Sequence, residues 1–399
     1  GGMRAVTWTQ VAQYIVLIIA YLLPIFWISN KLGAGFFPHF MLADEVARIG
    51  ELEQQFGFIK NSAADLATVP KGLAGITKAH SAVNATPWAF ISLALAMMMG
   101  TASLPHVMMR YFTTPSVKAA RKSVGWSLFF IFLLYSSAPM LATLSKLSLI
   151  DPTLPTGIIG KSFAEVQALS WFQNWNSANL MFISDFNGNG TLELNEFFMG
   201  GKAVVLATPE IAGLPYVISG LVAAGGMAAA MSTADGLILA IANAISHDVY
   251  YKMIDPKAET AKRLLVARVL LVVIGFAGAT IAAMEIQGIL GSVIWAFDFA
   301  MSGLFFPLVL GVWWKRANRE GAVAGMVLGL GSAIWYLVWV RTGGSGFLGL
   351  TQLTFGIFGA AVSCIAMVVV SLMTSAPEAA IQKMVDEVRI PSGRTVTGK

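Results

Sequence analysis

Long runs of apolar residues separated by short polar segments are the main pattern in this sequence. The runs reach about 18 or more residues, which is the length that an α-helix needs to cross a bilayer. The pattern predicts about eight spans, at residues 10–29, 87–109, 124–145, 210–246, 264–284, 288–313, 320–340 and 352–374. The fourth is too long for one straight crossing, so we expect either a tilted or bent helix or a span entered by a short outer segment. Gly213 with Pro215 is compatible with an entry turn at its outer end. We therefore expect an all-α polytopic membrane protein.

Composition agrees with this expectation. Of the 399 residues, 56% are apolar and only 12% are charged, whereas a soluble domain carries about 25% charged residues. Mean hydropathy is +0.71. The one cysteine, Cys364, lies within a predicted span, so an intrachain disulfide is impossible.

The positive charges predict how the chain is oriented. Lysine and arginine gather in the segments 110–122, 252–263 and 315–319, which all fall on one side of the predicted spans. The positive-inside rule makes that side cytoplasmic. We expect a transmembrane core over residues 1–375 in the plasma (inner) membrane and a cytoplasmic tail over 376–399, with both ends of the chain on the cytoplasmic side. The net charge of +5 then reflects topology and not nucleic-acid binding.

Two long loops, at about residues 31–86 and 146–209, fall on the outer side. The second contains the frame 185-DFNGNGTLELNE-196, which matches the calcium-loop pattern of an EF-hand. Extracytoplasmic modules of this kind bind Ca²⁺ at roughly 10⁻⁴–10⁻³ M. The predicted oxygen ligands come from alternate positions and the end of the frame: Asp185, Asn187, Asn189, Thr191 through its carbonyl, Glu193 through water, and Glu196.

Two features of this frame fit a calcium loop further. Gly190 permits the sharp turn and Leu192 fills the apolar eighth position. Helices are predicted on both sides, over 163–182 and 194–207. A chance match, or an Asx-rich turn without metal, is the alternative. The metal would order the outer loop and would not drive transport.

Hydroxyl groups form a cluster inside the fourth span, in 229-AAMSTADG-236. Polar groups within the membrane are costly, so they are functional candidates. The adjacent hydroxyls of Ser232 and Thr233, together with carbonyl oxygens, suit a hard cation such as Na⁺. The alternative is that both hydroxyls bond back to the preceding helical turn.

A second polar cluster occupies 100-GTASLPHVMMRYF-112. Gly100, Ser103 and Pro105 weaken a helix inside the membrane and leave backbone groups free to face a cavity. His106 and Arg110 lie four residues apart and share a helical face. Either His106 faces the path of a substrate or it caps the cytoplasmic end, whereas Arg110 is expected to anchor that end.

A single acid, Asp298, stands in the middle of the sixth span, where it must face protein or water. It either lines a substrate path or pairs with a neighbouring helix. With Ser103, His106 and Asp235 it completes the substrate-path candidates. His247 and Asp248 end the fourth span and are expected to be interfacial anchors.

Three glycines recur every four residues in the seventh span, at Gly321, Gly325 and Gly329. This spacing lets another helix approach closely and predicts helix packing.

Enzyme chemistry finds no support in the sequence. It has no P-loop, no HExxH and no GxSxG, and only four histidines. The chain is therefore not expected to be an enzyme.

Three segments resemble the sodium/solute symporter family, in the form of its acetate and monocarboxylate permeases. Residues 220–252 resemble the family's signature helix, with the Ser-Thr pair followed by Ser246-His247-Asp248-Val249-Tyr250. Residues 99–123 look like its G-x-PH-x-x-x-R segment. Residues 1–13 are similar to the start of its sixth helix.

The resemblance implies a leucine-transporter-like inverted-repeat fold and a sodium site made by Ser232, Thr233 and the carbonyl of Ala229. It also implies that the span at 88–109 lines the substrate cavity. Family members begin about five helices earlier, so the resemblance predicts a partial core that does not transport alone.

Together these patterns favour a sodium-coupled symporter of a small organic solute, with a monocarboxylate such as acetate as the candidate. Two rivals stay open. A transporter-like solute sensor would need a signalling extension, and the segment after residue 375 is short. A cation channel with a calcium-responsive outer loop would need a filter motif or a charged ring, and neither occurs.

Overall fold

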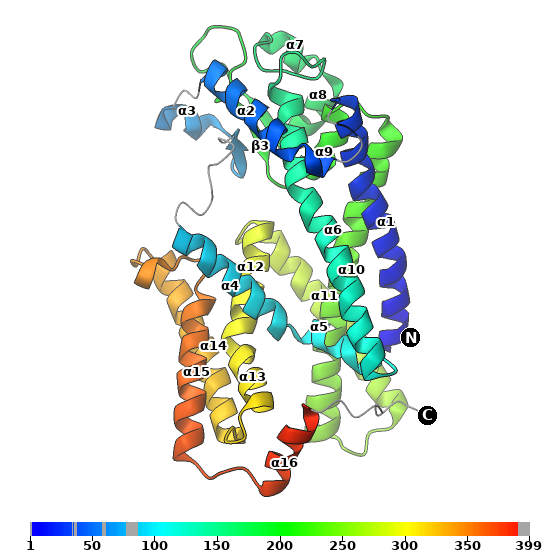
Figure 1. Cartoon of the computed structure of the whole chain (residues 1–399), viewed down its shortest axis with the longest axis vertical. Coiled ribbons are helices and arrows are strands. Elements are labelled where there is room, and N and C mark those ends of the chain that lie inside the picture. Colours follow the sequence, from blue (N-terminus) through cyan, green and yellow to red (C-terminus); the bar gives the residue numbers. More distant parts are fainter. Residues whose placement is uncertain (1, 34, 36–37, 58–60, 77–86, 390–399) are drawn as a thin grey trace. The chain divides into compact units, whose positions relative to one another are not determined.

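The structure, a computed structural model, describes residues 2–33, 35, 38–57, 61–76 and 87–389. It divides into two compact units (Figure 1). Unit 1 comprises Gly1–Ser81 and Gly125–Asp235, and unit 2 comprises Ala82–Val124 and Gly236–Lys399. The helices α6 and α10 belong to both units, because each crosses a boundary.

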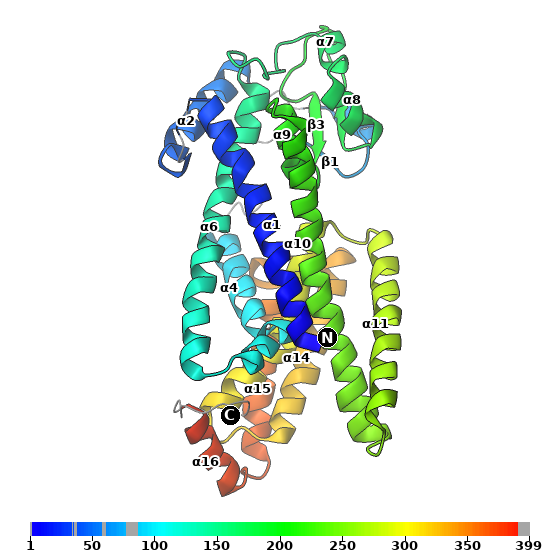
Figure 2. The same cartoon turned by 90° about the vertical axis from the view of Figure 1, so that its right-hand side faces the viewer.

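Unit 1 contains three long helices that run side by side, with smaller elements gathered at the end far from the N-terminus (Figures 1 and 2). The long helices are α1 (Gly2–Lys31), α6 (Val117–Ile150) and α10 (Tyr216–Asn243). The smaller helices are η1 (Pro38–Phe40), α2 (Leu42–Phe56), α3 (Ala63–Thr68), α7 (Phe163–Gln167), α8 (Ser170–Ser177) and α9 (Val204–Ile211).

A small antiparallel sheet joins these smaller helices. Its strands are β1 (Leu73–Gly75), β2 (Met181–Ile183) and β3 (Phe197–Gly200), in the order β1–β3–β2. Ala74 and Met181 both lie opposite Met199 of the central strand. We call α2, α7, α8, α9 and the three strands the cap.

The cap has a compact apolar core of its own. Phe172, Leu192 and Phe197 are at most 2% exposed and belong to one cluster of buried residues. The cluster also includes residues from the last turn of α6 and from the strand β2. A capping box starts α7, because Ser162 and Glu165 each bond the other's backbone N–H. Local capping and apolar burial therefore both favour this part of the fold.

Unit 2 is built from helices alone in its described part. Its first elements are α4 (Pro87–Ser103), α5 (Pro105–Met108) and η2 (Met109–Thr113). The π-helix η3 (Ala244–Ile254) continues α10 and is followed by α11 (Thr260–Ala283). The remaining elements are α12 (Ile289–Ala300), the π-helix η4 (Met301–Phe305), α13 (Phe306–Trp313), α14 (Arg319–Arg341), η5 (Phe347–Gly349), α15 (Gly356–Met373) and α16 (Ala379–Val388).

The predicted spans are confirmed. Among the described residues, seven helices are long and apolar enough to cross a membrane, or eight if the bent pair Pro87–Ser103 and Pro105–Tyr111 counts as one span. The fourth predicted span is entered by a short outer segment, which is the second of the two alternatives. The helix α9 ends at Ile211, Gly213 takes a φ of +63°, and α10 begins at Tyr216.

The packing role of the glycines in α14 is also confirmed. Gly321, Gly325 and Gly329 are buried against α15. A Cβ added to Gly321 would lie 1.9 Å from Ser371 Oγ, and one added to Gly325 would lie 3.1 Å from the Ser363 carbonyl oxygen. Only a residue without a side chain allows these backbones to come so close.

The helices predicted on both sides of the loop 185–196 are found only in part, since α7, α8 and α9 are helical but strands directly flank the loop. Helical structure in 163–182 ends with α8, where Asn179 takes a φ of +56°, and the strand β2 follows. On the other side β3 comes before α9. Aromatic residues decide this, because Phe182 pairs with Phe198 across the two strands and such pairs stabilise a sheet.

The segment after residue 375 forms α16 and packs on α13. Lys315 pairs with Asp386 at 2.7 Å. The guanidinium of Arg316 donates to the carbonyl oxygens of Thr374 and Ser375. The described part of the predicted tail is therefore attached to unit 2, and residues 390–399 lie outside the described residues.

Candidate functional site

The three residues predicted to bind sodium meet at one backbone carbonyl of α10. Ser232 Oγ donates to the Ala229 carbonyl oxygen at 2.9 Å, and Thr233 Oγ1 reaches the same oxygen at 3.4 Å. These are the bonds that hydroxyls make to the preceding turn of a helix. Each hydroxyl oxygen keeps lone pairs for a cation, so the arrangement is compatible with both alternatives that the sequence left open.

The opposite wall of this position comes from α1, which the sequence reasoning missed. Gln10 Nε2 donates to the Ser232 carbonyl oxygen at 2.6 Å. One turn further on, Gln13 Oε1 is buried and has no hydrogen-bond partner among the described residues. An amide oxygen without a partner is a suitable ligand for a hard cation. Two glutamines three residues apart in an apolar span were the signal for this wall.

Small residues bring α1 and α10 together. Gly225 is buried, and a Cβ at this position would lie 2.4 Å from the Ala20 Cβ. A larger residue at Gly225 would therefore push α1 away and move Gln10 out of reach of Ser232. The small-residue stretch of α10 thus serves helix contact as well as access to carbonyl groups.

A cavity of about 310 Å³ lies beside this contact, between α1, α6 and α10. Its lining is apolar apart from Tyr21 and Tyr135, and it includes Gly225 and Ala229. Of the predicted ion ligands it includes Ala229 alone, so its wall does not itself provide a set of oxygen ligands.

The break predicted near Ser103 is confirmed in unit 2. The helix α4 ends at Ser103, α5 begins at Pro105, and the two are bent by 50°. Ser103 is 0% exposed and donates to the Met99 carbonyl oxygen at 2.6 Å. His106 Nδ1 is buried and lacks a hydrogen-bond partner among the described residues. His106 is therefore the substrate-path candidate at this bend with a free polar atom.

The other two substrate-path candidates have different positions. Asp235 is the last residue of unit 1, three residues after Ser232. Asp298 is 0% exposed and lies against Gly356, the first residue of α15. Asp298 lines none of the four cavities described for this structure, and its carboxylate oxygens have no hydrogen-bond partner among the described residues, so both alternatives for Asp298 stay open.

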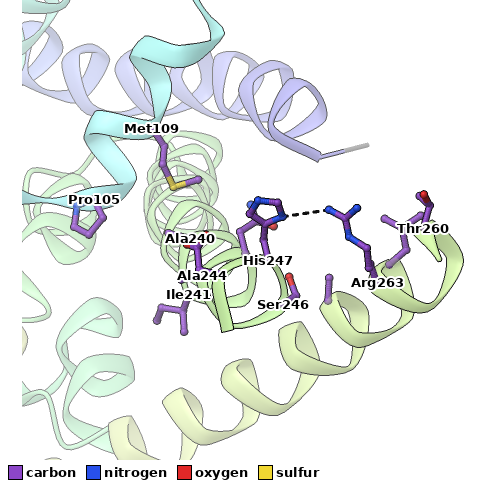
Figure 3. Close-up of a pocket in the computed structure, with 13 residues that line it drawn as sticks. Pro105, Met109, Ala240, Ile241, Ala244, Ser246, His247, Thr260 and Arg263 are labelled. Atoms are coloured by element: carbon purple, nitrogen blue, oxygen red, sulfur yellow. Dashed lines mark hydrogen bonds between the residues drawn. The ribbon is translucent and has the colours of Figure 1, made fainter. Parts of the chain in front are cut away.

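A larger cavity, of about 770 Å³, lies in unit 2 between α5, the end of α10 with η3, and α11 (Figure 3). Arg263 Nη2 lies 3.2 Å from His247 Nδ1, and the guanidinium stacks 3.8 Å from the centre of the Tyr251 ring. Asp248, which also lines the cavity, pairs with Lys252 at 3.1 Å. None of the residues predicted to bind sodium lines this cavity.

The loop 185–196 closes on its own backbone. The carboxylate of Asp185 accepts N–H groups from Gly188 and Gly190, at 2.7 and 2.9 Å. The carboxylate of Glu196 is 0% exposed and accepts the N–H groups of Phe186 and Glu193. The Asn187 and Asn189 side chains accept from the second residue after each.

Two predicted details of this loop are confirmed. Gly190 takes a φ of +75°, and Leu192 is 0% exposed in the cap core. The metal itself finds no support, since no group of three or more His, Cys, Asp or Glu in the described part of the chain is placed to hold an ion. Asp185, Glu193 and Glu196 thus do not converge, and Asn189 Nδ2 donates to Glu193 Oε1 instead.

Comparison with known proteins gives the family of this multi-pass membrane protein. The sequence pattern of the Sodium:solute symporter family matches residues 1–148 and 202–329. The chain therefore belongs to the sodium:solute symporter family. Residues 149–201, which contain the loop together with α7, α8, β2 and β3 of the cap, are outside the matched ranges.

Two curated relatives illustrate the family membership. An uncharacterized symporter of Cupriavidus necator is 34% identical, over 98% of this chain and 69% of that protein. A monocarboxylic acid transporter of Corynebacterium glutamicum is 26% identical, over 84% of this chain and 52% of that protein. The chain thus spans about half to two thirds of the length of these relatives.

A solved structure supports the fold. A Na⁺-coupled sialic acid symporter, in a substrate-bound outward-open state, superposes with a TM-score of 0.56 at 17% identity, over 95% of this chain and 64% of that one. The expected leucine-transporter-like fold is confirmed by this likeness, which at such low identity speaks for the fold alone.

Proposed function

We propose that this chain forms the coupling part of a sodium-driven symporter for a small organic solute, with Na⁺ held by Ala229, Ser232 and Thr233. The observation that carries the proposal is the meeting of both hydroxyls at the Ala229 carbonyl oxygen, opposite the amide groups of α1. Membership of the sodium:solute symporter family supports it.

To accept the ion, only the hydroxyl hydrogens of the proposed ligands would need to rotate, and the backbone of α10 would keep its position. When Na⁺ arrives, the Ser232 and Thr233 hydroxyls rotate their hydrogens away, which frees the Ala229 carbonyl and their own lone pairs for the ion. Gln13 Oε1 lies one turn from Gln10 on α1 and lacks a partner among the described residues, which makes it the candidate for a further oxygen ligand. Binding then stabilises the α1–α10 contact, which is how an ion selects one state of a transporter.

The sodium site is tested by replacing one hydroxyl. In Ser232→Ala, the Na⁺ concentration that gives half-maximal thermal stabilisation of the chain in nanodiscs should rise about tenfold, which corresponds to about 1.4 kcal/mol. Ser219→Ala is the matched control, since it removes a hydroxyl from the same helix far from the site, and it should leave the value unchanged. An unaltered Na⁺ dependence in Ser232→Ala rejects the site.

The proposed solute is a monocarboxylate such as acetate. The support is the Corynebacterium relative, whose name is that of a monocarboxylic acid transporter, together with the free nitrogen of His106 near the bend of α4. Because this partial core is not expected to transport alone, the test uses the full-length transporter: its proteoliposomes should take up labelled acetate under a Na⁺ gradient, in competition with unlabelled propionate. A steady Na⁺ current without solute would favour the channel instead, and solute binding without uptake would favour the sensor.

We further propose a plasma-membrane orientation with both ends of the chain in the cytoplasm and the cap outside. The basic segments 110–122, 252–263 and 315–319 support it. In a Cys364→Ala background, single cysteines that replace Lys118 or Asn187 should differ in their accessibility from outside the cell. An impermeant maleimide added to intact cells should label the second alone, and labelling at Lys118 would reverse the orientation.

Calcium binding by the loop 185–196 stays a prediction. The order of its oxygen donors supports it, whereas the separation of its carboxylates speaks against it. Calorimetric titration of the chain with Ca²⁺ should give heat in the range of roughly 10⁻⁴–10⁻³ M that Glu196→Gln abolishes. If the wild-type chain and Glu196→Gln give the same heat, Ca²⁺ binds elsewhere in the protein and the prediction for this loop is wrong.

A further inference from the structure

The carboxyl group of Asp298 is enclosed in unit 2 without a partner. It is 0% exposed, and both carboxylate oxygens lack a hydrogen-bond partner among the described residues. The backbone of Gly356, where α15 begins, approaches the carboxyl without completing a hydrogen bond of ordinary geometry. An ionised carboxylate is very costly in such a place, so the group needs either a cation or a proton.

The elements packed on α12 supply no cation beside this carboxyl. They are α4, η4, α14 and α15. The helices α4 and η4 contain no titratable residue, and α15 contains Cys364 alone. The charged residues of α14 lie at its two ends, and they are Arg319, Glu320 and Arg341. Its other titratable residue is the buried Tyr336, whose hydroxyl donates to the Leu350 carbonyl oxygen at 3.2 Å. Arg341 is exposed and lies over the Trp295 ring, 5.1 Å from its centre, one turn before Asp298.

Close packing leaves little space for a metal ion at this position. A Cβ added to Gly356 would lie 2.6 Å from Asp298 Oδ1, and one added to Gly359 would lie 2.4 Å from Ser302 Oγ. The Ser302 hydroxyl already donates to the carbonyl oxygens of Asp298 and Gly356, at 2.7 and 3.2 Å. A metal ion needs several free oxygens around a cavity, whereas a proton needs only one lone pair.

We propose that Asp298 is a proton-binding site in the membrane-embedded part of this chain. The carboxyl holds its proton while α12 is packed on α15, and it gives the proton to water when the two helices separate. The π-helix η4 directly follows α12, and such turns often mark functional places where a helix changes its course. The proposal goes beyond sodium coupling and shares no residue with the proposed sodium site.

The first test follows stability against pH in the whole chain, reconstituted in nanodiscs. Between about pH 5 and pH 9 the wild-type melting temperature should fall as pH rises, because the folded chain holds a proton that the unfolded chain releases. Asp298→Asn preserves the shape of the neutral group and should remove this slope. The control Asp248→Asn changes an exposed aspartate of the same unit and should retain it. A wild-type slope retained in Asp298→Asn overturns the proposal.

A second measurement uses the wild-type chain, so it can contradict the proposal even if Asp298→Asn does not fold. At about pH 8 ordinary carboxyl groups are ionised. Infrared spectroscopy should nevertheless detect the C=O stretch of a protonated carboxyl, and the band should vanish in Asp298→Asn where that variant folds. Absence of the band in the wild-type chain overturns the proposal. Both tests are read without Na⁺, so their failure is distinct from failure of the sodium site.

Discussion

The cap and the α14–α15 pair show two different ways to hold a protein together. In the cap, large side chains such as Phe172 and Phe197 are removed from water, and this burial drives folding. In the α14–α15 pair, glycines and serines fill the contact while apolar side chains such as Val327 and Val338 point outward, 64% and 55% exposed. Surrounded by lipid, these outward chains give no drive to fold, so close contact has to supply the stability.

The largest effect is expected at Gly329, where α14 lies against both η4 and α15. A Cβ on Gly329 would lie 2.1 Å from the Ser302 carbonyl oxygen and 2.6 Å from the Ser363 Cβ. Gly329→Leu should therefore separate the helices and cost more than the roughly 4–5 kcal/mol that marks exceptional substitutions. Size-exclusion chromatography should show loss of most monodisperse protein.

The same helix offers the control for that substitution. Gly331 has no atom within 4 Å of an added Cβ, so Gly331→Leu should elute like the wild-type chain. If both variants behave alike, close contact does not hold this pair together.

A smaller but still large effect is expected in the cap. Phe197 is 0% exposed in the apolar cluster, and Phe197→Ala should cost about 3–5 kcal/mol, from lost burial and the cavity left behind. Amide hydrogen exchange of β2 and β3 should accelerate accordingly. Phe182, on the paired strand, is only partly buried, so Phe182→Ala should have the weaker effect. Equal effects would contradict an apolar core as the source of stability.

The smallest effect concerns the start of α7. The backbone N–H of Ser162, followed by its hydroxyl, holds the pKa of Glu165 below its usual value. A lowered pKa of a carboxyl group stabilises the fold at pH values above its pKa in the unfolded chain, which is about 4.3. This stability is lost as the pH falls through the lower pKa of the folded chain. Hydrogen exchange over Phe163–Gln167, corrected for intrinsic rates, should rise on acidification. Glu165→Gln should remove this pH dependence, and a persisting dependence would assign it to another group.

The membrane part of the fold could be predicted closely from the sequence, and the cap could not. A run of about 20 apolar residues has few alternatives to a spanning helix. Among the described residues, seven of the eight predicted spans are single long helices, and the bent pair α4–α5 occupies the eighth. The segments around Phe182 and Phe197 are short and apolar, and periodicity alone does not separate helix from strand there. These two segments form strands because they pair with each other as β2 and β3, which their local sequences alone do not show.

The candidate sodium site shows a similar limit. The hydroxyls of Ser232 and Thr233 stand out in a stretch of small residues, and their meeting at Ala229 follows from helical spacing. The hydrogen bond from Gln10 to Ser232 comes from a helix more than 200 residues earlier, with a sequence separation of 222. One sequence carries no information on which distant span supplies that hydrogen bond.

The π-helix η4 gives the span Ile289–Trp313 a mechanical property of its own. Hydrogen bonding from i to i+5 places one more residue in this turn than an α-helix would hold. Removing one residue from Met301–Phe305 would restore a regular helix and turn everything beyond it by about 100°. Asp298 faces α15 before this turn, and α13 faces α16 after it. The extra residue in η4 therefore fixes the angle about the helix axis between these two faces.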